Sequence, residues 1–269
     1  MKQSLLFVIV LTLFASMLFA QQGELALHLF GSAGVPNGDF AKNIGDDTRI
    51  TRISGFAIGE RIGLAKTGPG AGFELIAPVW FRGLNWVFSS RIYVNGVNYE
   101  TIQSAYRSAF VGDTVVVKSK NSIVEGVTLD FGRWINIPVM TGFRFDHHFT
   151  HKYTLYGIIQ AGLNISKAPS YKATVTMTNP EGNRETITAD NTKYSFARDF
   201  GYEVGVGFVL DQTYNIGFRY MSLSSPRYDG TKKLSEKVFP YIYSRENDII
   251  GEERSISMFV VTLGIQLFR

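Results

Sequence analysis

The chain has 269 residues, a formal net charge of +4, 27 glycines, 14% aromatic residues and no cysteine. A chain without cysteine has neither a disulfide framework nor a thiolate metal site. The charge is mild and forms no basic run, which argues against a nucleic-acid partner. Abundant glycine and aromatic residues favour strands over helices, so the composition indicates an all-β protein.

Residues 1–20 have the pattern of a secretory signal peptide. Lys2 supplies a positive charge, an almost unbroken apolar segment runs from Leu5 to Phe19, and Ala20 stands at a plausible cleavage site. A retained helix is the alternative, but the apolar segment is short of the roughly 20 residues that a membrane span requires. We therefore expect export, removal of residues 1–20, and one domain over residues 21–269.

Apolar and other residues then alternate with period two in eight stretches. This alternation is typical of strands that have one apolar face. Each stretch is close to the roughly 9–11 residues of a tilted membrane-spanning strand, whereas ordinary strands average about 5–6 residues. The eight stretches are residues 25–34, 65–77, 84–95, 134–145, 154–165, 200–210, 214–222 and 257–267.

Long and short connections alternate strictly between these stretches. Outer-membrane barrels have short periplasmic turns and longer outer loops, whereas a soluble sandwich has no reason to sort its connections. We therefore predict an all-β, transmembrane antiparallel up-and-down β-barrel of about eight strands with both termini periplasmic. The long connections are 35–61, 96–133, 166–199 and 223–254, and the short ones are 78–83, 146–153 and 211–213.

Two of the long connections contain further, weaker alternation. Residues 114–118 with 122–130, and residues 171–178 with 184–188, have the pattern of hairpins. We interpret both as loop hairpins that project beyond the membrane. Each would add two strands if it entered the wall, so ten strands are the alternative.

Charged residues recur on the face of the strands opposite the apolar one. An arginine facing lipid near the midplane would cost about 2–4 kcal/mol, so these charges should point inward, where they need partners. Eight glycines on the same face, among them Gly72 and Gly205, leave room for arginines. Because an eight-stranded barrel is filled by side chains, we predict a closed interior without a pore. The predicted structural ion-pair network consists of Glu74, Arg91, Arg144, Glu203 and Arg219.

Aromatic residues gather near the ends of the predicted strands. Aromatic girdles are expected at both membrane interfaces of such barrels, and ordinary core aromatics are the alternative. The group comprises Trp80, Phe81, Trp86, Tyr153, Tyr156 and Tyr214 near the short turns, and Trp134 and Tyr202 toward the long loops.

Two short motifs resemble a known family. The segments LHLFG at 27–31 and VPNGDF at 35–40 resemble the first strand and loop of small outer-membrane β-barrel proteins common in Bacteroidota. The segment WINIPVMTG at 134–142 is similar to their mid-barrel strand. The resemblance implies an eight-stranded fold of the OmpA and OmpX type in the outer membrane of a Gram-negative-type cell.

The end of the chain partly matches the signal that the outer-membrane insertion machinery reads. Thr262, Gly264 and Leu267 have the expected spacing, although Arg269 follows the last aromatic residue. We therefore expect that machinery to be a partner during assembly.

Three motifs invite a chemical role. His147, His148 and His151, with Asp146, would form a metal site only if they converged on one ion, and a solvated polar turn is the simpler reading. The glycine-rich segment 68–72 lacks the lysine, hydroxyl and following helix of a phosphate-binding loop. We read it as a kinked strand.

His28 with Ser32 or Ser89 would supply the base and the nucleophile of a lipid-modifying outer-membrane enzyme. A packed lumen histidine is the reading we favour. We therefore predict no enzymatic activity, no cofactor and no metal site.

The last long connection mixes acidic and basic side chains, which is typical of a solvated surface and also suits lipopolysaccharide phosphates or a protein partner. The sequence favours an outer-membrane barrel with a structural or surface-interaction role. A narrow porin-like channel or transporter is the main alternative, followed by the enzyme. The expected partners are outer-membrane lipid and lipopolysaccharide, the insertion machinery and a protein at the outer loops, with no nucleic acid.

Overall fold

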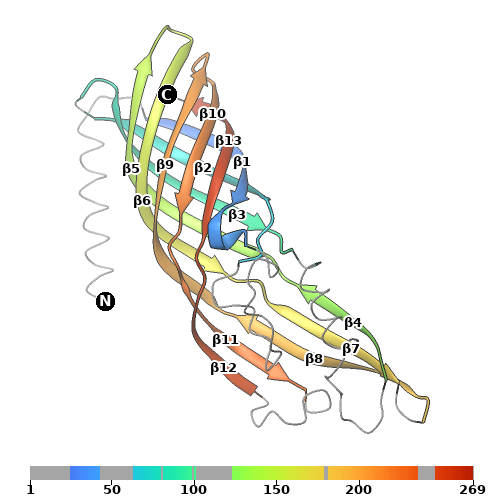
Figure 1. Ribbon diagram of the computed structural model, residues 1–269. Coiled ribbons are helices and arrows are strands. Elements are labelled where there is room, and N and C mark those ends of the chain that lie inside the picture. Colours follow the sequence, from blue (N-terminus) through green and yellow to red (C-terminus); the bar gives the residue numbers. More distant parts are fainter. Residues whose placement is uncertain are drawn as a thin grey trace.

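The computed structural model describes residues 25–42, 63–79, 81–98, 100, 123–178, 181–235 and 246–268. The predicted signal peptide, Trp80 and residues 114–118 lie outside these ranges, so the expectations placed on them stay predictions. The described chain is built from two β-structures, a closed barrel and an outer sheet (Figure 1). The barrel strands are β1 (Ala26–Pro36), β2 (Gly68–Pro78), β3 (Leu84–Asn95), β5 (Trp134–His148), β6 (Tyr153–Lys167), β9 (Phe196–Leu210), β10 (Tyr214–Ser222) and β13 (Ser257–Phe268).

The barrel strands pair in the order β1-β13-β10-β9-β6-β5-β3-β2, and β2 returns to β1 to close the ring. Every pairing in the ring is antiparallel. The predicted barrel of eight antiparallel strands is therefore confirmed. A closed ring leaves no unpaired strand edge, which is the condition for β-structure inside a lipid bilayer.

The short connections join neighbouring strands at one end of the barrel, where the β5–β6 and β9–β10 turns lie at the top of Figure 1. The β5–β6 turn is shorter than expected because β5 continues to His148 instead of ending near Phe145. In the β9–β10 turn, Asp211 and Gln212 have φ angles of 50° and 56°. These are residues without a β-branch, which tolerate the left-handed region in tight turns.

Parts of the long connections form the outer sheet, of order β12-β11-β8-β7-β4, at the opposite end (Figure 1). The hairpin predicted at 171–178 with 184–188 is confirmed as β7 and β8. The second half of the other predicted hairpin is present as β4, which pairs with β7, whereas its expected partner, residues 114–118, lies outside the described residues. The ten-strand alternative was also wrong, since these strands stay outside the barrel wall. The outer-sheet strands are β4 (Ile123–Phe131), β7 (Tyr171–Thr178), β8 (Arg184–Tyr194), β11 (Arg227–Leu234) and β12 (Glu246–Glu253).

Strands β11 and β12 were missed by the sequence analysis. Both are rich in charged residues, so their apolar alternation is weak. Their pairing is supported instead by cross-strand charges, as in the contact between Arg227 Nε and Glu253 Oε1 at 2.7 Å. Hydropathy alone does not reveal such a pair.

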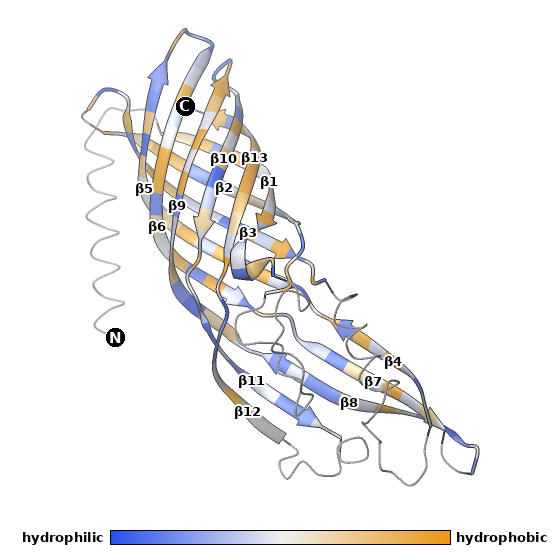
Figure 2. Cartoon of the chain, in the orientation of Figure 1, coloured by the Kyte–Doolittle hydropathy of each residue, from blue (hydrophilic) through white to orange (hydrophobic). Residues whose placement is uncertain are grey.

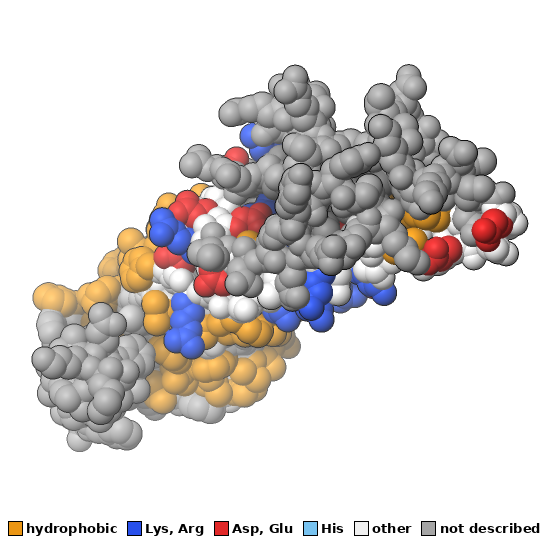
Figure 3. All heavy atoms as spheres, turned by 90° about the horizontal axis from the view of Figure 1, so that it is seen from below, with side chains coloured by type: hydrophobic (Ala, Val, Ile, Leu, Met, Phe, Trp, Pro, Cys, Tyr) orange, Lys and Arg blue, Asp and Glu red, His pale blue; other side chains and the backbone are white. Residues whose placement is uncertain are grey.

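The barrel wall alternates between a lumen face and an outer face. In β10, Asn215, Gly217 and Arg219 are buried, whereas Phe218 is 59% exposed. Figure 2 shows hydrophobic residues concentrated on the barrel strands, and hydrophilic ones on β8 and β11. On the face shown in Figure 3, hydrophobic side chains cover the barrel and most charged side chains lie toward the outer sheet. The exposed apolar residues include Leu29, Phe143, Ile159, Leu163, Phe200, Val206, Phe208, Phe259, Leu263 and Leu267.

Two lumen glycines make room for arginines, as expected. A Cβ added at Gly72 would lie 2.7 Å from Arg91 Cγ, and one at Gly205 would lie 2.7 Å from Arg219 Cγ. Both distances are shorter than van der Waals contact. The glycines are therefore a condition for placing the two guanidinium groups in the lumen.

The expected aromatic girdle needs correction at two positions. Phe81, Tyr153, Tyr202 and Tyr214 are exposed on the wall or at its end, as a girdle requires. Tyr156 and Trp134 are buried instead, because each is in phase with the lumen-facing residues of its strand. The period-two alternation, not nearness to a strand end, decides which aromatics reach the lipid.

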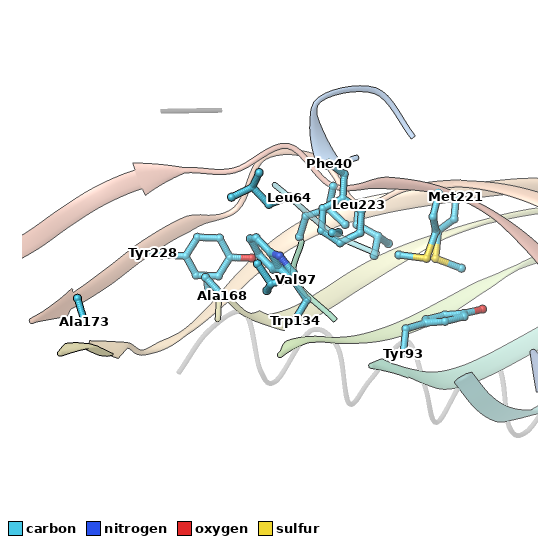
Figure 4. Close-up of a cluster of buried hydrophobic side chains, with 14 of the residues drawn as sticks. Phe40, Leu64, Tyr93, Val97, Trp134, Ala168, Ala173, Met221, Leu223 and Tyr228 are labelled. Atoms are coloured by element: carbon cyan, nitrogen blue, oxygen red, sulfur yellow. The ribbon is translucent and has the colours of Figure 1, made fainter. Parts of the chain in front are cut away.

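An apolar cluster fills the loop end of the lumen and continues under the outer sheet (Figure 4). Trp134 lies at its centre: its indole Nε1 donates to the Gly63 carbonyl at 2.8 Å, and its ring meets Phe40 edge-on at 5.3 Å. Tyr228 of β11 packs on the other side of Trp134, with ring centroids 6.0 Å apart. Because the cluster joins residues of the barrel and of β11, the two structures share one core.

Candidate functional site

Four charged side chains meet inside the barrel. Arg91 Nη2 lies 2.8 Å from Glu74 Oε1, and Arg219 Nη1 lies 2.7 Å from Glu203 Oε1. Each of these pairs joins neighbouring strands, β2 with β3 and β9 with β10. All four side chains are at most 1% exposed. With two acids and two bases, the group is neutral as a whole.

Two further ion pairs cross the lumen. Arg91 also contacts Glu203, and Arg219 Nη1 lies 2.5 Å from Glu74 Oε1. Three strands separate β3 from β10, and β2 from β9, in either direction around the ring. The two wall pairs therefore face each other across the full width of the barrel, and their ion pairs close the lumen at this level.

Neutral side chains complete the surroundings of this lumen ion-pair network. Gln160 Oε1 accepts hydrogen bonds from Ser89 Oγ at 3.1 Å and from Arg91 Nη2 at 3.3 Å. The Phe30 ring lies 5.2 Å from the Arg91 guanidinium carbon and 5.8 Å from that of Arg219. A cation over an aromatic face gains electrostatic stabilisation, so Phe30 supports both arginines.

Arg144 lies apart from the other four residues that the sequence grouped with it. Its Nε donates to Asp146 Oδ1 at 2.6 Å, and its guanidinium carbon lies 3.9 Å from the centre of the Tyr156 ring. Asn85 Nδ2 donates to the second carboxylate oxygen of Asp146 at 2.9 Å. The sequence analysis placed Asp146 in a turn. In the structure, β5 continues to His148, so Arg144 and Asp146, two residues apart, lie on the same face of the strand.

A cavity of ≈ 200 Å³ opens at the short-turn end of the barrel, lined in part by Arg144, Asp146 and His28. His28 Nε2 lies 3.0 Å from Gln266 Oε1, and His28 Nδ1 lies 3.0 Å from Asn215 Nδ2. The Gln266 oxygen accepts and the Asn215 amide donates, so this pattern fits a neutral ring with its proton on Nε2. The imidazole thus bonds to two amides, not to Ser32 or Ser89.

Of the three histidines near the β5–β6 turn, His147 and His148 make separate side-chain contacts. The His147 ring packs edge-on against Phe149 at 4.7 Å, and His148 Nδ1 lies 2.7 Å from Thr154 Oγ1. Within the described ranges, no group of three or more His, Asp or Glu side chains is arranged to hold a metal ion. The described residues also include no helix long and apolar enough to cross a membrane.

A buried carboxylate lies at the centre of the outer sheet. Asp190 accepts from Thr192 Oγ1 at 2.9 Å and from the Tyr171 hydroxyl at 3.2 Å, and Lys232 Nζ lies 3.6 Å away. Burial raises the pKa of Asp190 above its ordinary value, although the Lys232 cation and the hydrogen bonds oppose this shift. The same burial raises the pKa of Tyr171.

We expect the outer sheet to become less stable as pH rises above about 3.8, the ordinary pKa of aspartate. Because the folded-state pKa is raised, the folded sheet holds the Asp190 proton more tightly than the open sheet does, and this stabilisation is lost as pH rises through the raised pKa. Amide hydrogen exchange of β7 and β8, corrected for intrinsic rates, measures the opening free energy. Asp190→Asn should flatten this pH dependence, and an unchanged pH profile in that variant would contradict the assignment.

Charge and apolarity are thus inverted relative to a soluble protein: ion pairs lie in the centre, and large apolar side chains lie on the outer wall. Water cannot favour so large an exposed apolar surface, whereas hydrocarbon does. The chain is a transmembrane β-barrel. The described parts of the long connections lie at one end of it and the short turns at the other.

No family model and no curated protein matches this sequence. Among solved structures, similarity is found to Ail of Yersinia pestis, with 10% identity, a TM-score of 0.38, and coverage of 92% of this chain and 100% of that chain. Neisserial surface protein A has 9% identity and a TM-score of 0.38, with 90% and 95% covered. The outer membrane protein OprG of Pseudomonas aeruginosa has 7% identity and a TM-score of 0.42, with 92% and 97% covered. The strand order and register of the chain define the closed barrel independently of these likenesses.

Proposed function

We propose that this barrel is an outer-membrane protein with a structural or surface-interaction role, and that it presents the outer sheet at the cell surface. The observation that carries the proposal is the shared apolar core around Trp134, which joins the sheet to the barrel. A sheet held in this way has a fixed position above the membrane. It is therefore suited to present a surface to lipopolysaccharide or to a protein partner.

The closed lumen supports a non-channel role over the porin-like alternative. Glu74 and Arg91 from one side meet Glu203 and Arg219 from the other, so their side chains occupy the cross-section. The apolar cluster around Trp134 lies between this level and the outer sheet. A channel would instead produce ion conductance in a planar bilayer, which we do not expect from this arrangement.

The contacts of His28 support a non-enzymatic role. A nucleophile requires a base within hydrogen-bond reach, and the described partners of this imidazole are Gln266 and Asn215. We further propose that the chain belongs with the small outer-membrane barrels that its motifs resemble, and that it is exported by its first 20 residues and inserted by the outer-membrane machinery.

The orientation can be tested with single cysteines, because the native chain has none. Glu181 is exposed at the tip of the β7–β8 hairpin, and Lys152 is exposed in the β5–β6 turn at the other end. In intact cells, we expect a membrane-impermeant maleimide to label Glu181→Cys at least about tenfold more than Lys152→Cys, because the bilayer separates the two ends.

After lysis, both variants should be labelled to similar extents, which controls for thiol reactivity. Strong labelling of Lys152→Cys and weak labelling of Glu181→Cys in intact cells would reverse the proposed orientation. Equal labelling in intact cells would contradict a membrane-spanning location.

A further inference from the structure

Three basic residues lie on the outer wall of the barrel near the long connections. Arg133 directly precedes β5, Lys167 ends β6, and Arg198 is near the start of β9. Arg133 and Arg198 are exposed and Lys167 is half-buried. We call these three residues the basic row. Their strands are neighbours in the order β5-β6-β9.

The strand register places the basic row at one height. Lys167 pairs with Ile135 of β5 and Phe196 of β9. Arg133 lies two residues before Ile135 and Arg198 lies two residues after Phe196. In the strand register, Lys167 is therefore two residues nearer the short turns than Arg133, and Arg198 is two residues nearer the short turns than Lys167.

Tilted strands require a shift in this sense to keep a constant height around a barrel. The short-turn end shows the same sense of displacement: Leu84 opens β3 opposite Phe145, whereas β5 continues three residues further, to His148. The three cations therefore follow the rim of the barrel and do not spiral along it.

Apolar residues lie directly below the basic row. Two residues nearer the middle of each strand, the outer face carries Ile135, Ile165 and Phe200. Phe200 is 57% exposed. Apart from Phe196, which is 57% exposed beside Lys167, the strongly exposed apolar residues of β5, β6 and β9 lie on the short-turn side of the cations. That is the arrangement expected where hydrocarbon gives way to headgroups.

Among the described residues, no carboxylate lies within ion-pair distance of any member of the basic row. Lys167 contacts the Phe196 ring, with Nζ 5.4 Å from its centre. By contrast, Arg184 and Arg227 of the outer sheet pair with glutamates at 2.9 and 2.7 Å.

We propose that the basic row binds the phosphate groups of an outer-leaflet lipid headgroup, with the acyl chains of that lipid on Ile135, Ile165 and Phe200. The inference rests on the proposed outer-membrane function and names one lipid contact of the barrel. Charge complementarity and continuity with the apolar wall both favour a phosphorylated lipid as the occupant. In Figure 3, Lys and Arg side chains lie beside the hydrophobic surface on the face shown.

The test uses the folded full-length barrel in detergent micelles, with diphosphorylated lipid A as the probe and native mass spectrometry to measure its binding. Each cation near a charged lipid contributes about a fivefold factor in affinity. The triple variant Arg133→Gln, Lys167→Gln, Arg198→Gln should therefore bind lipid A roughly a hundredfold more weakly. The double variant Arg133→Gln, Arg198→Gln changes only exposed residues and should lose about thirtyfold even if the triple variant folds poorly.

A charge-matched control removes three exposed cations elsewhere, with Arg82→Gln, Lys152→Gln and Lys193→Gln. It should bind lipid A like the native chain, and dephosphorylated lipid A or inorganic phosphate should bind the native chain much more weakly. Equal losses in the double variant and the control, or tight binding of the dephosphorylated lipid, would overturn the inference.

Vesicle flotation separates this inference from the proposed function. A native chain that inserts into phosphatidylcholine vesicles but shows no preference for lipid A overturns only the lipid contact. A native chain that does not insert overturns both, because the wall would then not face lipid.

Discussion

Replacing Arg91 with methionine should lower the free energy of unfolding by about 3–5 kcal/mol, because a buried ion pair that loses one partner leaves uncompensated charge. Arg91 contacts both Glu74 and Glu203, and all three side chains are buried. In the variant, Arg219 alone would face two carboxylates across the lumen. Urea titration of the barrel in micelles, followed by the heat-modifiable shift on a gel, measures the loss.

Two further variants control this experiment. Arg82→Met removes an exposed arginine from the β2–β3 turn and should change stability by no more than about 0.5 kcal/mol. Adding Glu203→Gln to Arg91→Met restores neutrality among the remaining charges, so the double variant should be more stable than Arg91→Met alone. If Arg91→Met lost less than about 1 kcal/mol, the lumen would be solvated and the ion pairs would not close it.

The alternation of apolar and polar residues identified the strands and the lumen face, but not the partners inside the lumen. Period two is enough to place Glu74 and Arg219 on one face of their own strands. That they meet depends on the ring, because β2 and β10 have only β1 and β13 between them on the shorter path. Pairing across a lumen is a property of the closed barrel, which no local window of sequence contains.

Arg144 shows a second limit, set by the length of a strand. The sequence placed the end of β5 near Phe145, which left Asp146 in a turn and Arg144 without a local partner. The strand continues to His148, so Asp146 is two residues further along the same face and takes the arginine. Strand ends are weakly encoded when polar residues replace the apolar ones that mark the membrane.

The outer sheet was the least predictable part of the fold. Its strands come from three different connections, and β8 pairs with both β7 and β11. The Asp190–Lys232 contact between β8 and β11 joins residues that are far apart in sequence. Each strand alone is short and polar, and its stability comes from its neighbours.

The membrane assignment itself leads to the second large effect, at Phe218. This residue is central in β10 and is 59% exposed on the outer wall. Phe218→Arg should destabilise the barrel folded in a bilayer by roughly 2–4 kcal/mol, because a charged side chain near the midplane leaves water for hydrocarbon. Folding into phosphatidylcholine vesicles, titrated with urea and monitored by gel shift, measures this loss.

The depth dependence of that loss distinguishes lipid from any other apolar surroundings. Ser222 lies on the same face of β10, four residues nearer the long connections, where Tyr202 is its cross-strand neighbour. Ser222→Arg should cost only about 0–1 kcal/mol because the side chain reaches the interface, and Phe218→Leu should stay close to the native chain because it adds no charge. A soluble barrel would accept arginine at exposed position 218 as readily as at 222. If the two arginine substitutions destabilised the barrel equally, the wall could not face lipid. A much larger loss at position 218 than at position 222 is expected only if the wall faces lipid.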